Sequence, residues 1–112
     1  MTWYQAKEYC EEHGGYLADI LSQEEQDIAT ELASNVNVNV WIGGIRYGTQ
    51  NHFLWLDQTP VESSYTNWYQ GQPYHAAGGT VCMNMIIEWN YRWNDASCSS
   101  LCGSICKIKE QL

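Results

Sequence analysis

The chain has 112 residues, enough for one domain, 1–112, with a modest hydrophobic core. Its 13 acidic and five basic residues give a net charge of −8, which argues against nucleic acids and anionic membranes as partners. Six Trp and eight Tyr against one Phe favour half-buried positions and binding surfaces, because indole and phenol groups carry a polar end.

The first helix is predicted to begin directly after Thr2. Thr2 and Gln5 form the pattern of a capping box, and Gly14-Gly15 ends the helix. One face of this helix carries the residues that we expect to be buried, Trp3, Ala6 and Cys10.

A second helix is predicted after Ser22. Ser22 with Glu25 forms another capping-box pattern. Ile28, Leu32 and the nearby alanines recur at helical spacing, so we expect them to form the buried stripe.

Short strands are predicted in the rest of the chain. The apolar run 40–44 is typical of a buried strand, and 52–57 alternates like a half-buried one. Further strands are expected at 81–87, 91–93 and 104–109. Two helices followed by short antiparallel strands indicate the α+β class.

Segment 58–79 is rich in Gly, Pro, Ser, Thr and Tyr and has little periodicity. Loops of that length in a compact domain are usually functional or disordered. Its aromatic residues favour an ordered loop that packs against the core: Tyr65, Trp68, Tyr69 and Tyr74.

Five cysteines in a short chain indicate two disulfides and one remaining thiol, and therefore a secreted or extracellular protein. A metal site is the competing interpretation, because Cys98, Cys102 and Cys106 recur every four residues. The segment around them is poor in helix formers, and the chain has no cysteine or histidine pair at zinc spacing. No leader or apolar spanning run is present, so a targeting segment would have been removed, and membrane insertion is not expected.

Catalysis is not expected from the residue pattern. The three histidines, His13, His52 and His75, are scattered, and no serine or cysteine lies in a nucleophile motif. We therefore expect that the protein is not an enzyme.

A series of aromatic, glycine and cysteine motifs runs along nearly the whole chain. In order, they are Trp3, Ala6 and Cys10, Gly15-x-Leu17-Ala18, Trp41-Ile42-Gly43, Trp55-x-Asp57, Asn67-Trp68, Gly71-Gln72-Pro73, Cys82, Trp93-Asn94-Asp95, Cys98 and Ile105-Cys106-Lys107. In this order and spacing the chain resembles the C-type lectin-like domain family, which implies an α+β fold with a long ordered binding loop.

The resemblance also implies two disulfides, Cys10–Cys106 and Cys82–Cys98. Cys102 has no partner in the family pattern. Either it is a small buried hydrophobe, or it forms an inter-chain disulfide in a homodimer.

The start of the chain departs from the family pattern. Family members have one or two strands before the first helix, and these pair with the last strand. Here that strand is missing, which would leave the edge of the strand at 105–108 open. The missing strand was trimmed, or a second chain supplies it, which is a second route to a homodimer.

In sugar-binding family members, five positions hold a calcium ion and also bond two sugar hydroxyls. Carried onto this chain they are Gln72, Tyr74, Thr80, Asn94 and Asp95. Gln72, Asn94 and Asp95 match the family pattern, whereas Tyr74 and Thr80 do not. Gln72 before the proline resembles the galactose-type arrangement, and the resemblance implies a cis Gln72–Pro73 bond.

The substitutions leave only one carboxylate, on Asp95, among the five positions. Calcium sites are tuned by ligand charge, so we expect no cofactor, or weak Ca²⁺ binding at about millimolar affinity or weaker. The auxiliary calcium position of the family is also depleted, because Val81 replaces an acid and 47–52 contains none.

Aromatic residues are candidates to replace the metal in ligand binding. Tyr74 and His75 lie at the tip of the long loop, with Tyr69 and 89–91 expected nearby. Their alternative role is ordinary loop packing, and Asn94 and Asp95 would then cap a turn beside a buried Trp93.

The predicted function is an extracellular, carbohydrate-binding recognition module with a degraded calcium site. The predicted ligand-binding residues are Gln72, Tyr74, His75, Asn94 and Asp95, of which Gln72, Asn94 and Asp95 are the metal ligands. The alternative is a protein–protein interaction module that binds neither sugar nor calcium. Binding to ice or a mineral surface is a third possibility, for which the sequence offers no flat Thr-rich face.

Overall fold

The computed structural model describes residues 1–48, 50–74 and 79–108. Helix α1 (Trp3–Glu12) begins at the predicted capping box: Thr2 Oγ1 accepts the Gln5 amide at 3.2 Å, and Gln5 Oε1 accepts the Thr2 amide at 2.9 Å. Its buried residues are Trp3, Ala6 and Cys10, as predicted. The sequence therefore correctly gives both the start of α1 and its buried face.

Helix α2 (Gln23–Val36) begins at Ser22, whose hydroxyl accepts the Glu25 amide at 3.1 Å. The predicted buried stripe is correct for the nearby alanines and wrong for Ile28 and Leu32, which are 54% and 50% exposed. The residues that face the core are Gln26, Ala29 and Ala33. Small alanines allow the helix to approach the sheet closely, and the buried polar Gln26 is not part of a hydrophobic pattern.

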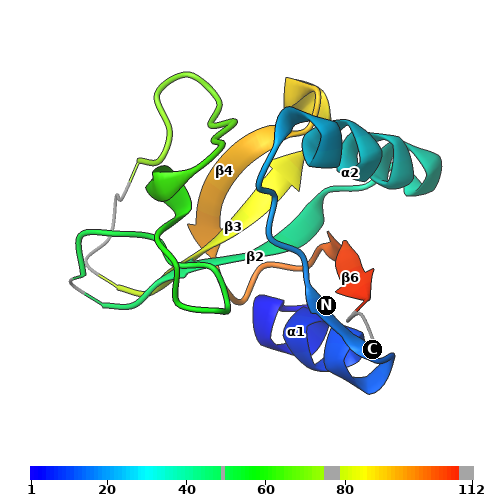
Figure 1. The fold of residues 1–112 in the computed structure, drawn as a ribbon, viewed down its shortest axis with the longest axis horizontal. Helices are drawn as coiled ribbons and strands as arrows, with labels where there is room; N and C mark the ends of the chain where they lie inside the picture. Colours follow the sequence, from blue (N-terminus) through cyan, green and yellow to red (C-terminus); the bar gives the residue numbers. More distant parts are fainter. Residues whose placement is uncertain (49, 75–78, 109–112) are drawn as a thin grey trace.

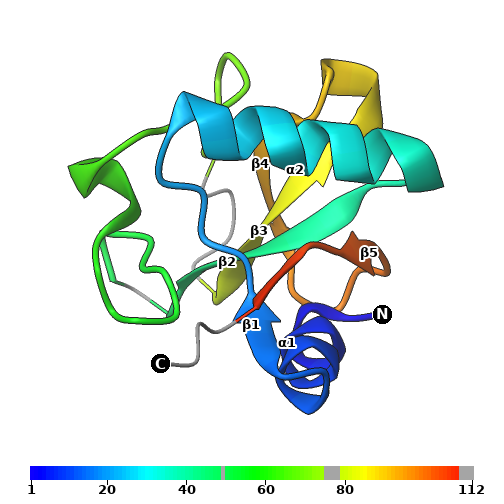
Figure 2. The ribbon, with the colours of Figure 1, turned by 45° about the vertical axis from the view of Figure 1, so that its right-hand side comes forward.

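The main sheet has four strands in the order β4-β3-β2-β5. Their bounds are β2 Val40–Arg46, β3 Val81–Ile86, β4 Arg92–Ser97 and β5 Gly103–Ser104. β3 pairs antiparallel with β2 and β4, and β5 pairs parallel with β2. Figure 2 shows α2 lying across one face of this sheet, where Ala29 and Ala33 join the same hydrophobic cluster as Met85 and Trp93.

A second sheet of two strands lies beside α1 (Figure 1). β1 (Gly15–Leu17) pairs antiparallel with β6 (Cys106–Ile108). β1 was not predicted, and it covers one edge of the final strand, which was expected to be open. The two strands approach so closely that a Cβ on Gly15 would lie 2.0 Å from the Lys107 carbonyl oxygen, which explains the glycine at this position.

Segment 52–57 alternates in burial but does not form the predicted strand. Phe53 and Trp55 are buried, and Leu54 makes only isolated bridges, to Ile45 and to Pro60. The following segment contains a short 3₁₀ turn, η1 (Val61–Ser63), and a second one, η2 (Ile87–Trp89), lies between β3 and β4.

Trp93 is fully buried and anchors the long loop to the sheet. Its ring lies edge-on to Trp55, Trp68 and Tyr65, with centroids 5.7, 5.7 and 5.9 Å away. The Trp93 amide donates to the Asn67 carbonyl oxygen at 2.9 Å, and the Tyr69 amide donates to the Trp93 carbonyl oxygen at 3.0 Å. The described part of the loop is therefore ordered by aromatic packing and backbone hydrogen bonds.

Both expected disulfides are present. Cys10–Cys106 joins α1 to β6, and Cys82–Cys98 joins β3 to the end of β4. Cys102 is a free, half-buried thiol; burial raises its pKa, and the Asn84 amide donates to its sulfur at 3.6 Å.

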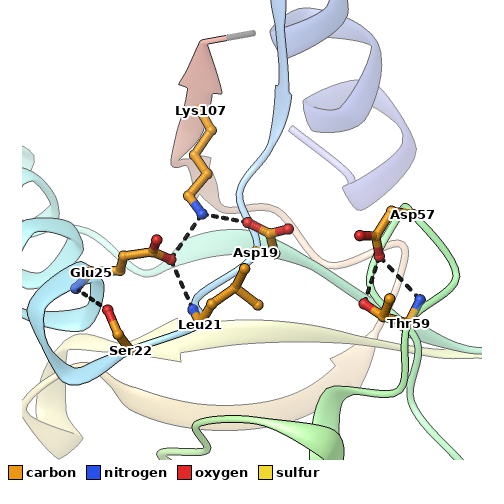
Figure 3. Close-up of polar contacts among 7 residues, drawn as sticks. All are labelled: Asp19, Leu21, Ser22, Glu25, Asp57, Thr59 and Lys107. Carbon is orange, nitrogen blue, oxygen red and sulfur yellow. Dashed lines mark hydrogen bonds and ion pairs between the residues drawn. The ribbon is translucent and has the colours of Figure 1, made fainter. Parts of the chain in front are cut away.

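A charged cluster fixes β6 against the start of α2 (Figure 3). We define the scaffold cluster as Lys107, Asp19 and Glu25. Lys107 Nζ donates to both carboxylates, at 2.8 Å for Glu25, and the Glu25 carboxylate also accepts the Leu21 amide at 2.8 Å. The side chain of Glu25 thus accepts a backbone amide of the loop before α2 and does not complete the predicted capping box with Ser22.

Candidate recognition site

The described members of the predicted site come from the long loop and from β4. We define the recognition surface as Gln72, Tyr74, Asn94 and Asp95. The Tyr74 amide donates to Asp95 Oδ1 at 3.0 Å, which ties the loop to β4, and the Gln72–Pro73 bond is cis. The structure therefore brings the two halves of the predicted site together.

Asn94 and Asp95 lie inside strand β4 rather than capping a turn, so that alternative is wrong. Asn94 pairs with Asn84 across the antiparallel ladder, and its side-chain amide donates to Asn84 Oδ1 at 3.2 Å. Asn84 is buried and was not predicted as part of the site. Its signal in the sequence is a single amide within the otherwise apolar stretch 81–87.

Gln72 presents an unusual polar atom. Its Oε1 is buried and accepts no hydrogen bond from the residues that the structure describes, while its backbone amide donates to the Tyr69 carbonyl oxygen at 2.9 Å. A buried acceptor without a donor is destabilising, and a hydroxyl or a cation would satisfy it. Gln72 thus retains the chemistry that a polar ligand requires.

Thr80 takes the position that the family resemblance assigns to a glutamate. Its hydroxyl accepts the Gly48 amide at 3.1 Å, so it holds a neighbouring turn instead of facing a ligand as a charged group. Within residues 1–48, 50–74 and 79–108, no group of three or more His, Cys, Asp or Glu side chains is placed to hold a metal ion.

The aromatic candidates separate into two groups. Tyr74 is 71% exposed, and Tyr69 stacks on Trp89 with ring centroids 4.1 Å apart and an interplanar angle of 12°. Tyr91 is only 4% exposed and its hydroxyl donates to the Ala33 carbonyl oxygen at 3.1 Å, so its predicted place in the site is wrong. His75 lies outside the described residues.

A cleft of about 450 Å³ lies away from these residues, between α1, β1 and the turn after Trp55. Its lining is Lys7, Glu11, Tyr16, Leu17, Asp19, Leu56 and Asp57. Asp57 is already engaged, because Thr59 donates to it through both its amide, at 3.0 Å, and its hydroxyl, and these bonds lower the Asp57 pKa. Lys7 is likewise paired with Glu11 at 2.8 Å.

A family model described as the lectin C-type domain matches residues 1–108. The chain belongs to the C-type lectin domain family. The mouse protein "C-type lectin domain family 4 member A" is 35% identical over 114 residues, which cover 97% of this chain and 45% of the mouse protein. "Salivary C-type lectin 2" of Aedes albopictus is 32% identical, with 98% and 79% of the two chains covered. This C-type lectin domain thus spans less than half the length of the mouse relative.

Two solved structures illustrate the range of the family. The carbohydrate-recognition domain of the mouse scavenger receptor C-type lectin superposes with a TM-score of 0.83 at 31% identity, covering 99% of this chain and 84% of that one. A structure described as a calcium-independent type II antifreeze protein superposes with a TM-score of 0.80 at 35% identity, covering 95% and 77%. The α+β fold predicted from the sequence is confirmed by these similarities. The relatives and structural neighbours are lectins and related binding proteins rather than enzymes.

No helix among the described residues is both long and apolar enough to span a bilayer. This finding concerns residues 1–48, 50–74 and 79–108 alone.

Proposed function

We propose that this C-type lectin domain is an extracellular recognition module that binds carbohydrate weakly and without requiring calcium. The observation that carries the proposal is the bond from the Tyr74 amide to Asp95. Asp95 supplies the only carboxylate among the five family positions, and here it already holds the loop against β4. The recognition surface is therefore assembled by the protein's own backbone.

A tight calcium site does not fit these residues. Gln72 Oε1 is a buried acceptor that a cation would satisfy, but Tyr74 offers no carboxylate, and the Thr80 hydroxyl is bound to Gly48. One negative charge is too little for a strong calcium site. We therefore assign the surviving groups to direct contact with a ligand.

Sugar rings have polar edges and apolar faces. The side chains of Gln72, Asn94 and Asp95 supply hydrogen-bonding groups for the edge, and the exposed ring of Tyr74 supplies an apolar surface for stacking. Without a metal to replace the hydration of the hydroxyls, such binding is expected to be weak.

The alternative is a protein ligand. A tyrosine that is 71% exposed beside a polar rim is typical of a protein-binding hot spot, and the net charge of −8 favours a basic partner. The same surface would serve this function.

We further propose that the protein is secreted. Two disulfides favour an oxidising compartment, and one relative carries "salivary" in its name. A homodimer through Cys102 or through the outer edge of β6 remains a prediction, to be tested by sedimentation with and without reductant.

The proposed function is tested by calcium titration in a calorimeter and by glycan-array binding with and without chelator. We expect glycan binding that the chelator leaves unchanged. Binding abolished by chelator would disprove calcium independence, and no binding in either condition would favour the protein ligand. The variant Tyr74→Asp with Thr80→Glu restores two carboxylates at the family positions and is the positive control, since it should gain a calcium response.

A further inference from the structure

Arg46 is a buried cation at the end of β2. Arg46 is only 6% exposed, and it is one of just five basic residues in the chain. A guanidinium is always charged, so burying it is unfavourable unless hydrogen-bond acceptors surround it. The partners of Arg46 therefore indicate what it does.

Among the described residues, Arg46 donates to backbone carbonyl oxygens from two separate segments. Arg46 Nη1 donates to the carbonyl oxygens of Gly48 and Gln50, at 2.9 and 3.0 Å. Arg46 Nη2 donates to the carbonyl oxygen of Gly79 at 3.5 Å. One planar, charged fork thus joins the turn that follows β2 to the segment that precedes β3.

A second contact joins the same two segments. The Gly48 amide donates to Thr80 Oγ1 at 3.1 Å, and the Gln50 amide closes the turn by donating to the Tyr47 carbonyl oxygen at 3.0 Å. Thr80 directly precedes β3, whose Met83 pairs with Asp95 of the recognition surface. Thr80 therefore lies three residues before the residue of β3 that pairs with Asp95.

We infer that Arg46 is a positioning residue for the recognition surface, its guanidinium holding Gly48 and Gln50 against segment 79–80 in the way that a bound metal ion would. Convergent backbone carbonyl oxygens are ligands of hard cations. Here the positive charge is covalently attached, so the geometry does not depend on a dissociable ion. The inference rests on the proposed function only in naming the surface that is positioned.

The test is amide hydrogen exchange of Arg46→Met, measured residue by residue. Loss of the charge-assisted bonds to Gly48, Gln50 and Gly79 should speed exchange at the Gly48 and Gln50 amides by about tenfold or more relative to the Tyr69 and Trp93 amides. The latter two amides anchor the long loop without contacting Arg46, so they serve as internal references. Arg92→Met, which removes the same charge from an exposed position, is the matched control and should change neither pair.

Two further measurements keep the inference testable if Arg46→Met does not fold. Arg46→Lys keeps the positive charge but not the planar guanidinium with its several donors. Exchange at Gly48 and Gln50 should therefore still be accelerated over the wild type by more than exchange at the reference amides. In the wild-type protein, chelator should leave these rates unchanged. Equal exchange changes at both pairs of amides in the variants, or faster exchange at Gly48 on chelation, would overturn the role of Arg46.

The outcomes separate this inference from the proposed function. If the wild-type protein binds no glycan but exchange at Gly48 is accelerated in Arg46→Met, sugar recognition is refuted and the positioning role of Arg46 is supported. If the wild-type protein binds glycan but exchange at Gly48 is unchanged in Arg46→Met, the positioning role of Arg46 is refuted and sugar recognition is supported.

Discussion

The scaffold cluster and the recognition surface use carboxylates in different ways. In the scaffold cluster, Lys107 donates to Asp19 and to Glu25 (Figure 3), and all three side chains are partly shielded from solvent. At the recognition surface, Asp95 accepts a neutral backbone amide from Tyr74 at 3.0 Å. Opposite charges join β6 to the segment that begins α2, whereas the bond from the Tyr74 amide to Asp95 has a neutral donor and is expected to be weaker. We therefore expect mutations to cost more stability in the scaffold than at the recognition surface.

The largest effect should come from the two disulfides. Cys10–Cys106 has a sequence separation of 96 and Cys82–Cys98 one of 16. Chain entropy then assigns the first about 5 kcal/mol and the second about 3 kcal/mol. Urea denaturation of the two Cys→Ser double variants measures both losses. Equal losses would show that loop length does not govern the difference.

Replacing Lys107 with Met tests the scaffold cluster directly. The substitution leaves two partly shielded carboxylates without their cation, so the free energy of unfolding should fall by about 1.5–2 kcal/mol after screening by solvent. Lys7→Met is the matched control, because Lys7 pairs with Glu11 on an exposed helix face, where the loss should be below about 0.5 kcal/mol. Urea denaturation of both variants at neutral pH gives the comparison, and similar losses would contradict it.

The scaffold cluster should also make stability depend on pH. Burial raises the pKa of Glu25, but hydrogen bonds from Lys107 and the Leu21 amide outweigh burial and lower this pKa below its usual 4.5. Burial lowers the pKa of Lys107, but its two carboxylate partners outweigh burial and raise this pKa above its usual 10.5. The Glu25 contribution is thus fully present above pH 4.5 and lost as pH falls through the lowered pKa. The Lys107 contribution is lost only as pH rises through its raised pKa.

Thermal unfolding from neutral to acidic pH measures this dependence. The difference in stability between the wild type and Lys107→Met should narrow as the pH falls below 4.5, because protonated Glu25 no longer needs a cation. A constant difference across this range would mean that the stabilisation by Lys107 is not electrostatic.

Local signals in the sequence were sufficient for much of the fold. The cap at Thr2 depends on Gln5 only three residues away, and the disulfides follow the family spacing. The buried face of α2 was predicted only in part. Its alanines are buried as expected, but Gln26 was missed, because its Oε1 accepts the indole N–H of Trp93 at 2.8 Å, across 67 residues of sequence. A polar side chain that satisfies a buried tryptophan cannot be recognised from helical periodicity.

The candidate site was likewise predicted only in part, because some of its contacts join residues that lie far apart in the sequence. The loss of ligand charge at Tyr74 and Thr80 is visible in the residue types themselves. The hydrogen-bond partners of Thr80 and Asn94 are not visible in the residue types. Thr80 accepts the Gly48 amide across 32 residues of sequence, and Asn94 donates to Asn84 across the β3–β4 ladder. Such contacts depend on strand register, which the sequence alone did not specify.

Asp95→Ala should produce a smaller loss than Lys107→Met. It removes the acceptor of the Tyr74 amide at a half-exposed position, so we expect a loss of about 1 kcal/mol. The Tyr74 amide should also exchange faster with solvent. Glu88→Ala, an exposed acid outside the site, is the matched control and should be nearly neutral. A loss as large as that of Lys107→Met would remove the distinction between the two regions.

Tyr74→Ala should have the smallest effect on stability. The side chain is 71% exposed, and the backbone amide that bonds Asp95 is retained, so the free energy of unfolding should change by less than about 0.5 kcal/mol. Ligand binding should nevertheless weaken, because the exposed ring is the apolar contact of the proposed surface. Tyr69→Ala is the contrasting control, since it removes the stack on Trp89 and should destabilise the loop. A stability loss without any binding defect in Tyr74→Ala would assign this tyrosine to the scaffold and remove it from the recognition surface.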